Sequence, residues 1–387
     1  MTDVGHFLTV KISFCYFPCK ITEQEDMMRR SIRLLAAAAL GISSIATPGT
    51  MQSGQAATEA CSLNYHCYAK VADSADNNTG VSVDMYVQCL GVSDPKNSFA
   101  NWEMWNITAD NGSTWLESGQ KYGIFHYPAN TQNGNYVWFW AQQYSGGKFA
   151  EHYVMSGSGA QWVNTSITTS GGGSWDISQA GKKIGSTASG PVGVYVQAGA
   201  EVTAEPQSSL NAYINNFQVR QEGKWAGVLP TWTNTSDGWL QGLANDGTTG
   251  AWAHAWTNNC STPNVSPNAS SPLTASSAPA VLQGLAHQIS AANGESKPSD
   301  ITFVLSTRQR AVTALAKSQV AGDGPSYLVQ LHGHFNGAAA SIPQGGKAPH
   351  GTTLTFVVDS HDGTVTDWGI SSQDIPMENL GTVHAVR

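Results

Sequence analysis

The sequence predicts a mainly β protein, in which an antiparallel β-sandwich of jelly-roll or concanavalin-like form is followed by a small α+β domain. Two observations carry this prediction. From Cys61 to about Trp256, short segments of alternating apolar and polar residues recur every ~8–12 residues between glycine-rich turns, as in sandwiches and barrels. Forty glycines and a charged fraction of only 12% also favour strands and turns over long surface helices.

The clearest predicted strand runs from Val81 to Cys89, where every odd-numbered residue is apolar or cysteine and every even-numbered residue is Ser, Asp, Tyr or Gln. Such alternation is typical of a strand with one buried face. The other strands predicted in this region are Asn101–Ile107, Trp115–Tyr122, Asn135–Gln142, Phe149–Met155, Gln161–Thr168, Trp175–Ser178, Val192–Thr203 and Ala212–Val219.

The last third of the chain has a different pattern. Residues 257–280 are rich in Ser, Pro, Asn and Thr without periodicity, which predicts a flexible linker. A short helix is expected at Val281–Ala292 and a second at Thr307–Gln319. Strands at Tyr327–His334, Thr352–Val358 and Thr364–Ile370, the last two joined by a hairpin turn, complete the small α+β domain.

The beginning of the chain predicts export. Arginines 29, 30 and 33 precede the apolar run 34–42, and Gln55-Ala56-Ala57 offers small residues for cleavage. We therefore divide the chain into an upstream extension with a signal peptide (1–57), the β-sandwich domain (58–256), a Ser/Pro-rich linker with a possible short helix (257–298) and the α+β domain (299–387). A secreted, extracellular protein is expected.

The charge and the cysteine content indicate which partners and which cross-links to expect. The net charge is −8 and no Lys/Arg cluster follows residue 35, so nucleic acid is not expected as a partner. After signal removal no apolar run is long enough to span a membrane. Four cysteines remain in the mature chain of an exported protein, which predicts two disulfides with three possible pairings among Cys61, Cys67, Cys89 and Cys260.

Two glutamates are the candidate catalytic residues. Glu117 shares a strand face with Trp115, and Glu201 shares one with Tyr195 and Gln197, while small apolar residues occupy the opposite face of the second strand. Two neighbouring carboxyls can share a proton, so that one activates water while the other polarises a carbonyl oxygen. The residues expected to line the groove around them are Trp115, Tyr136, Trp138, Trp140, Gln142, Tyr195 and Gln197.

Four segments resemble the strand order of glutamic peptidases, across about residues 61–232: Asn101–Trp105, Trp115–Gly119, Tyr136–Trp140 and Gly199–Glu201. The fungal eqolisins carry a catalytic glutamine in the first catalytic strand, and the plant neprosin-like members use two glutamates. The resemblance implies that Glu117 takes the first catalytic position and Glu201 the second, in an acid-active peptidase. The segment is also similar to secreted actinobacterial proteins of unassigned role.

A second interpretation uses the same aromatic residues without carboxyl chemistry. Exposed Trp and Tyr rings stack on sugars, so the sandwich is alternatively a lectin-like module that binds extracellular polysaccharide instead of a polypeptide, with Trp138, Trp140, Trp162 and Trp175 as candidates. In the C-terminal domain His332 and His334 share a strand face, but no spaced carboxylate or cysteine completes a ligand set. We expect neither a metal nor a cofactor.

Overall fold

The computed structural model describes residues 66–92, 94–95, 97–124, 137–156, 161–203, 209–228, 231–234, 242–245, 253–256 and 272–386. All of them belong to one compact unit, Ala56–Arg387. The predicted signal peptide, Cys61, Tyr136, Cys260 and residues 257–271 of the predicted linker lie outside the described residues. Within the described part, no helix combines the length and the apolar character needed to cross a bilayer.

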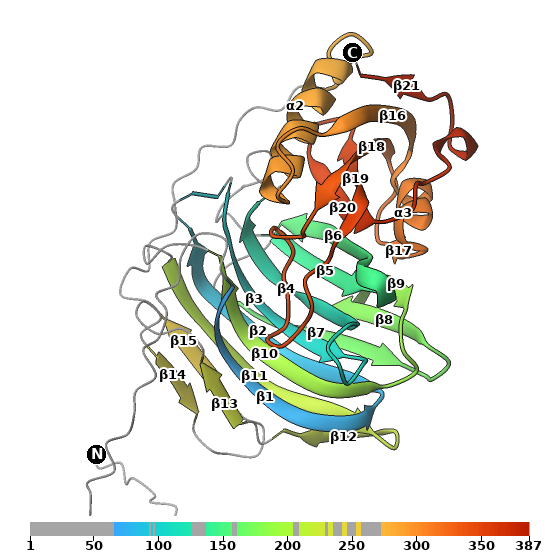
Figure 1. The fold of residues 1–387 in the computed structure, drawn as a ribbon. Helices are drawn as coiled ribbons and strands as arrows, with labels where there is room; N and C mark the ends of the chain where they lie inside the picture. The colour runs from blue at the N-terminus through green and yellow to red at the C-terminus, as the bar shows by residue number, and fades with distance from the viewer. Residues whose placement is uncertain are drawn as a thin grey trace, which may run out of the picture. The chain divides into compact units, whose positions relative to one another are not determined.

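Two antiparallel sheets form this unit (Figure 1). The larger one has 12 strands, in the order β13 (Thr231–Asn234), β1 (Cys67–Asn78), β10 (Gly193–Val202), β3 (Phe99–Ile107), β4 (Trp115–Gly123), β5 (Val137–Gln143), β6 (Phe149–Ser156), β20 (Val365–Ser371), β19 (Gly351–Asp359), β18 (Pro325–Phe335), β16 (Ser299–Thr307) and β21 (His384–Ala385). The second has nine, in the order β14 (Gly242–Asn245), β15 (Ala253–Trp256), β11 (Ser209–Gln221), β2 (Gly80–Gly91), β7 (Trp162–Thr169), β8 (Ser174–Gln179), β9 (Lys182–Ala188) and β17 (Gln319–Val320), with β12 (Lys224–Gly227) paired to β11.

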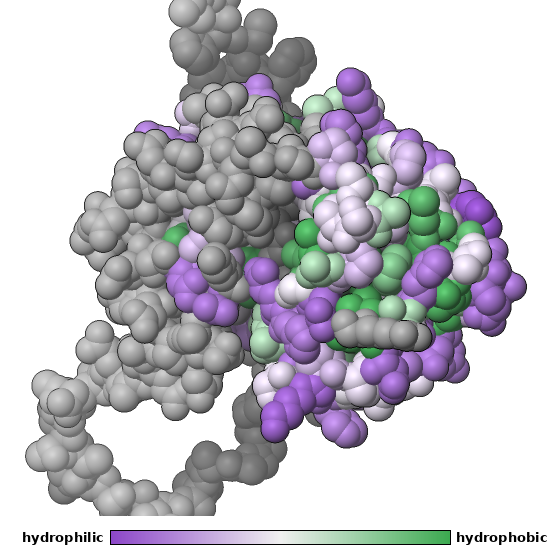
Figure 2. Space-filling view, turned by 90° about the horizontal axis from the view of Figure 1, so that it is seen from above, coloured by the Kyte–Doolittle hydropathy of each residue, from purple (hydrophilic) through white to green (hydrophobic). Residues whose placement is uncertain are grey.

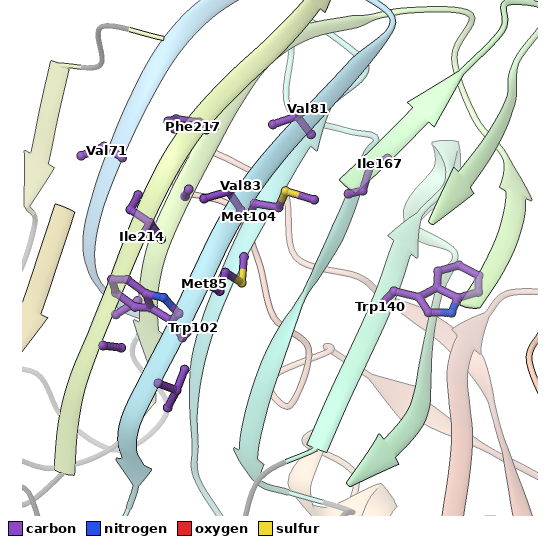
Figure 3. Packing of buried hydrophobic residues seen from close by; sticks show 14 of the residues in the cluster. Val71, Val81, Val83, Met85, Trp102, Met104, Trp140, Ile167, Ile214 and Phe217 are labelled. Carbon is purple, nitrogen blue, oxygen red and sulfur yellow. The ribbon is translucent and has the colours of Figure 1, made fainter. Parts of the chain in front are cut away.

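The main apolar core lies between the two sheets. Alternate residues of β2 point into it, so that Val81, Val83 and Met85 are fully buried, as the alternation predicted. Trp102 and Met104 of β3 enter the same core from the larger sheet (Figure 3). Burying these side chains removes apolar surface from water, at about 25 cal/mol per Å². The predicted mainly β fold with an antiparallel sandwich is confirmed.

The C-terminal strands continue the larger sheet. β20 pairs with β6 through Asp367↔His152 and the three following residue pairs, so β20, β19, β18, β16 and β21 belong to the same hydrogen-bonded sheet as β1, β10, β3, β4, β5 and β6. Helix α2 (Ala278–Ala292) covers one face of these strands and α3 (Arg308–Ala316) lies in a second apolar cluster with Ala150. The domain boundaries proposed from the sequence stay a prediction, since they describe composition and not strand pairing.

Strands β3, β4 and β5 are buried along their entire length. One face of each meets the smaller sheet, and the other face is covered by elements from the C-terminal third of the chain. Both faces are therefore shielded from water, although the second face carries Glu, Lys and Asn side chains. That second face, which we call the carboxyl face, holds the candidate site.

Candidate active site

Strand register brings three glutamates onto the carboxyl face. Residues opposite one another in paired strands share a face. Glu103 of β3 lies between Gly199 of β10 and Gly119 of β4, which are its two partners. Glu201 is two residues beyond Gly199 on β10, and Glu117 is two residues before Gly119 on β4. The three glutamates therefore run diagonally across β10, β3 and β4, so Glu117 and Glu201 lie on the same face of the sheet.

The two glycines beside Glu103 let the strands carry these bulky groups. A Cβ added to Gly119 would lie 2.5 Å from both Cα and Cβ of Glu103, closer than such atoms can approach. A Cβ added to Gly199 would lie 2.6 Å from the Cα of Lys70 on β1. The space that these side chains would fill is left to the carboxyl groups and to Lys70.

A hydroxyl from a distant loop lies between the carboxyls. Residues 336–350 connect β18 to β19, and we call this segment the cover loop; Figure 1 shows it running down over the strands of the carboxyl face. Its Ser341 Oγ lies 2.5 Å from Glu201 Oε2 and 2.9 Å from Glu103 Oε1. The Ile342 amide donates to both oxygens of Glu201, at 3.1 and 3.0 Å, and the His66 imidazole also bonds to Glu201.

These contacts indicate which of the two carboxyl groups beside Ser341 carries a proton. A hydroxyl donates only one hydrogen, so Ser341 can donate to only one of the two carboxyls that it touches. Glu201 accepts from the Ile342 amide as well, which is what a carboxylate does. The hydrogen bond between Ser341 and Glu103 then needs a proton from Glu103 itself.

Burial supports that assignment. It raises the pKa of Glu103 well above its usual range, and the nearby charges of Glu117 and Glu201 raise it further. Burial likewise raises the pKa of Glu117, with Glu201 and then Glu151 adding to the effect. Neither oxygen of Glu117 lies within hydrogen-bond distance of a described partner, so burial outweighs the opposing effects of Lys121 and Ser341 on its pKa. Burial therefore favours the neutral forms of Glu103 and Glu117, while both oxygens of Glu201 accept hydrogen bonds as those of a carboxylate do.

Two buried lysines flank the glutamates. Lys70 of β1 donates to Gln197 and lies 3.9 Å from the centre of the Tyr68 ring. Burial lowers the pKa of Lys70 well below its usual range, against the opposing effect of Glu201 and Glu103. Lys121 of β4 contacts both oxygens of Glu151 at 2.9 Å. Lys121 is therefore paired with Glu151, and its charge also opposes the rise in the pKa of Glu103 and Glu117.

Several residues predicted to line the groove lie elsewhere. In β5, Phe139 and Ala141 oppose Gly119 and Glu117, so Trp138, Trp140 and Gln142 project from the other face of the sheet. Trp138 and Trp140 belong to the core between the sheets, and Gln142 bonds to Thr187 and Ala188 of β9. The prediction that these three share a groove with Glu117 is wrong. Alternation showed that they share a face with each other, but not which face meets the second sheet.

The remaining predicted residues behave differently. Trp115 is buried on the carboxyl face, in a cluster with Trp105, Ile107 and Ile342. Gln197 bonds to the main chain of Gln344, and Tyr195 is partly buried against the same cluster. Tyr136 lies outside the described residues. The structure thus brings Trp115, Tyr195 and Gln197 to the face that carries Glu117 and Glu201.

Sequence reasoning did not select Glu103, Lys70 or Ser341. Glu103 alternates with Trp102 and Met104 in β3, so its face was readable from the sequence, but its position between Gly119 and Gly199 depends on register. Lys70 lies in β1, a strand that was not predicted. Ser341 lies 140 residues from Glu201 in a loop without local periodicity, so no signal in the sequence marks it.

Other parts of the described structure offer less chemistry. No group of three His, Cys, Asp or Glu residues is arranged to hold a metal ion there. His332 instead bonds to Asp374 at 2.9 Å. A cavity of about 530 Å³ lies among Phe303, Leu305, Tyr327 and neighbouring residues, and touches none of the carboxyls. Figure 2 shows the face seen from above, where apolar residues gather among polar ones.

Comparison with known proteins gives matches among solved structures but not among sequences. No protein family and no curated protein sequence matches the chain. Among solved structures, it is similar to scytalido-glutamic peptidase with a peptide-based transition-state analogue, at 11% identity and a TM-score of 0.36, and with another transition-state-analogue inhibitor, at 12% and 0.37. It is also similar to SCP-B, an eqolisin-family peptidase in complex with a tripeptide, at 11% and 0.33. Each match covers 49% of this chain and 98% of the other.

Proposed function

We propose that the protein is a glutamic-peptidase-like hydrolase whose carboxyl face cleaves peptide bonds. The observation that carries the proposal is that the buried Glu103 and Glu201 contact one hydroxyl position, with the buried Glu117 on the same face and the neutral forms of Glu103 and Glu117 favoured by burial. Acid and base groups held at unequal protonation in a water-poor site are what general acid–base catalysis needs.

The geometry supports the following division of roles. A water at the position of the Ser341 hydroxyl would give its proton to Glu201 as its oxygen bonds to the carbonyl carbon. Glu103 would orient that water, and neutral Glu117 would donate a hydrogen bond to the developing oxyanion. Glu201 would then pass its proton to the amide nitrogen as the C–N bond breaks, which leaves a carboxylic acid and an amine.

The carbohydrate-binding alternative receives less support. Trp138, Trp140 and Trp175 are buried and present no ring to a sugar. Of these four tryptophans only Trp162, which is 52% exposed, presents its ring; it lies 5.4 Å from Tyr86, which in turn lies 5.8 Å from Tyr213 on the smaller sheet. We therefore take extracellular polypeptide as the substrate.

The proposal is tested by hydrolysis of a denatured protein from pH 3 to 7. We expect activity in the acid range and a loss of about 10²- to 10⁴-fold in Glu201→Gln, the change that removes the general base. Glu117→Gln should lower the rate by weakening the oxyanion contact. The exposed Glu378→Gln serves as control. Unchanged activity in Glu201→Gln would eliminate the mechanism.

A further inference from the structure

The cover loop touches the carboxyl face mainly through its main chain. The Ile342 amide donates to Glu201 and the Ile342 carbonyl accepts from the Tyr68 hydroxyl at 2.7 Å. Two residues on, the Gln344 amide donates to Gln197 Oε1 at 3.1 Å, and its carbonyl accepts from Gln197 Nε2 at 3.0 Å. Contacts that use amide and carbonyl groups would hold any polypeptide in the same path, whatever its side chains.

One side chain of the cover loop is inserted into a pocket. Ile342 is 6% exposed and packs in a cluster with Trp105, Ile107 and Trp115. Tyr195 packs against the same cluster and also lines a cavity of about 330 Å³ beside Gln344 and Gly345. This cavity thus lies beside the residues that follow Ile342 in the cover loop.

The Ser341 hydroxyl occupies the position between Glu103 and Glu201 that a reacting water would need. A hydroxyl and a water offer similar donors and acceptors, so one can replace the other. While Ser341 stays there, the carboxyls have no open position for a second oxygen.

We propose that the segment from Ser341 to Gln344 is an intramolecular pseudosubstrate, which lies in the groove where a substrate polypeptide would lie. This inference rests on the proposed function and deepens it. The site takes an extended peptide whose aliphatic side chain enters the Trp105–Trp115 pocket, and a substrate enters it by displacing the cover loop. Trp105 and Trp115 are thereby specificity-determining residues.

A binding experiment tests this without relying on catalysis. The probe is a synthetic peptide with the sequence of residues 338–346, Ala-Ala-Ala-Ser-Ile-Pro-Gln-Gly-Gly. We expect it to bind the full-length Ile342→Ala variant at least ~10-fold more tightly than the unmodified chain, because truncation weakens the internal competitor. A probe with Asp in place of Ile should not bind. Isothermal calorimetry and tryptophan fluorescence measure both.

Ile375→Ala is the matched control, since Ile375 is 9% exposed and lies in a different apolar cluster. Its affinity for the probe should equal that of the unmodified chain. Equal affinity in the Ile342 and Ile375 variants would overturn the inference.

A second measurement uses the unmodified chain, so it does not depend on how a variant folds. Excess probe should displace the cover loop and speed hydrogen exchange at the Ile342 and Gln344 amides at least ~10-fold. Unchanged exchange at saturating probe would also overturn the inference. Displacement without hydrolysis of any peptide would support the pseudosubstrate and reject the peptidase function, so the two failures are distinguishable.

Discussion

The surroundings of Glu117 favour its protonated form. It is fully buried, its oxygens have no hydrogen-bond partner among the described residues, and burial is the largest cause of its raised pKa. Keeping it neutral avoids the cost of a buried charge, which amounts to several kcal/mol. The fold therefore favours the protonated form, and its stability must depend on pH.

The first prediction concerns that dependence. Above the ordinary glutamate pKa of 4.5, the unfolded chain loses protons that Glu103 and Glu117 keep in the folded chain. Their contribution to the free energy of unfolding is thus complete below pH 4.5 and declines as pH rises toward the raised values, by up to about 1.4 kcal/mol per pH unit for each group. Urea unfolding at several pH values should show a shallower decline in Glu117→Gln than in the unmodified chain. Parallel curves of the free energy of unfolding against pH would refute this prediction. The Glu378→Gln variant controls for the loss of a surface charge.

The second prediction separates packing from binding at Trp138. This side chain is 3% exposed in the core between the sheets. We expect Trp138→Ala to lower the free energy of unfolding by roughly 3–5 kcal/mol, as large core truncations do. Trp162→Ala, at a 52% exposed position, should cost far less. Denaturant unfolding compares the two, and a near-neutral Trp138→Ala would contradict the assignment to the core.

For single residues, the sequence predicted which side chains share a strand face better than it predicted where each side chain lies in the sheet. Alternation placed Glu117 with Trp115 and Glu201 with Gln197, and both pairs share the carboxyl face. It could not say which face of β5 meets the second sheet, because β5 is buried on both sides and carries tryptophans on one of them. Glu103 became a candidate only when register set it between two glycines.

Among the elements, the junction of β6 with β20 joins the early and late parts of the larger sheet. Asp367 of β20 contacts His152 of β6 at 2.8 Å and the Arg308 guanidinium at 2.8 and 3.0 Å, and it is fully buried. Although burial opposes it, the charge of Arg308 and the bonds from His152 and Arg308 lower the pKa of Asp367 to about 2. The junction thus depends on one carboxylate.

The third prediction follows from that dependence. Asp367→Asn leaves Arg308 buried without its counter-ion, and we expect a loss of about 3–5 kcal/mol in the free energy of unfolding. The control Asp176→Asn breaks a half-exposed pair with Lys183, which should cost about 0–1 kcal/mol. Because the Asp367 pKa is lowered, its contribution is present above pH 3.8 and disappears as pH falls toward 2. Similar losses in the two variants would argue against it.

Most elements were predictable where one face alternates clearly. The limits of β2, β10 and the hairpin of β19 and β20 differ from the predicted ones by at most two residues. β1, β9 and β16 were not predicted, and β1 combines Tyr68 and Lys70 with a buried setting that its sequence does not signal. The pairing of β6 with β20 joins residues more than 200 positions apart, which local patterns cannot reveal.

The fourth prediction concerns the molecule as a whole: the chain is exported and forms a disulfide. We expect a secreting host to release a chain that begins at about residue 58, because the charged and apolar runs before it form a signal. We also expect Cys67 and Cys89, which are both buried, to form one disulfide. N-terminal sequencing and non-reducing peptide mapping test these points. A mature chain that retains residue 30, or a reduced Cys67, would contradict them.

The cover loop has a consequence for the order of synthesis. All three glutamates precede residue 202, whereas Ser341 and the strand β20 that pairs with β6 follow residue 340. A ribosome therefore completes the carboxyl groups well before it makes either the hydroxyl that lies between them or the strand that protects the edge of β6. An unprotected strand edge exposes unpaired N–H and C=O groups, which can pair with another chain and cause aggregation. A chain cut short after residue 320 would carry both hazards at once: an open acidic groove and a free sheet edge.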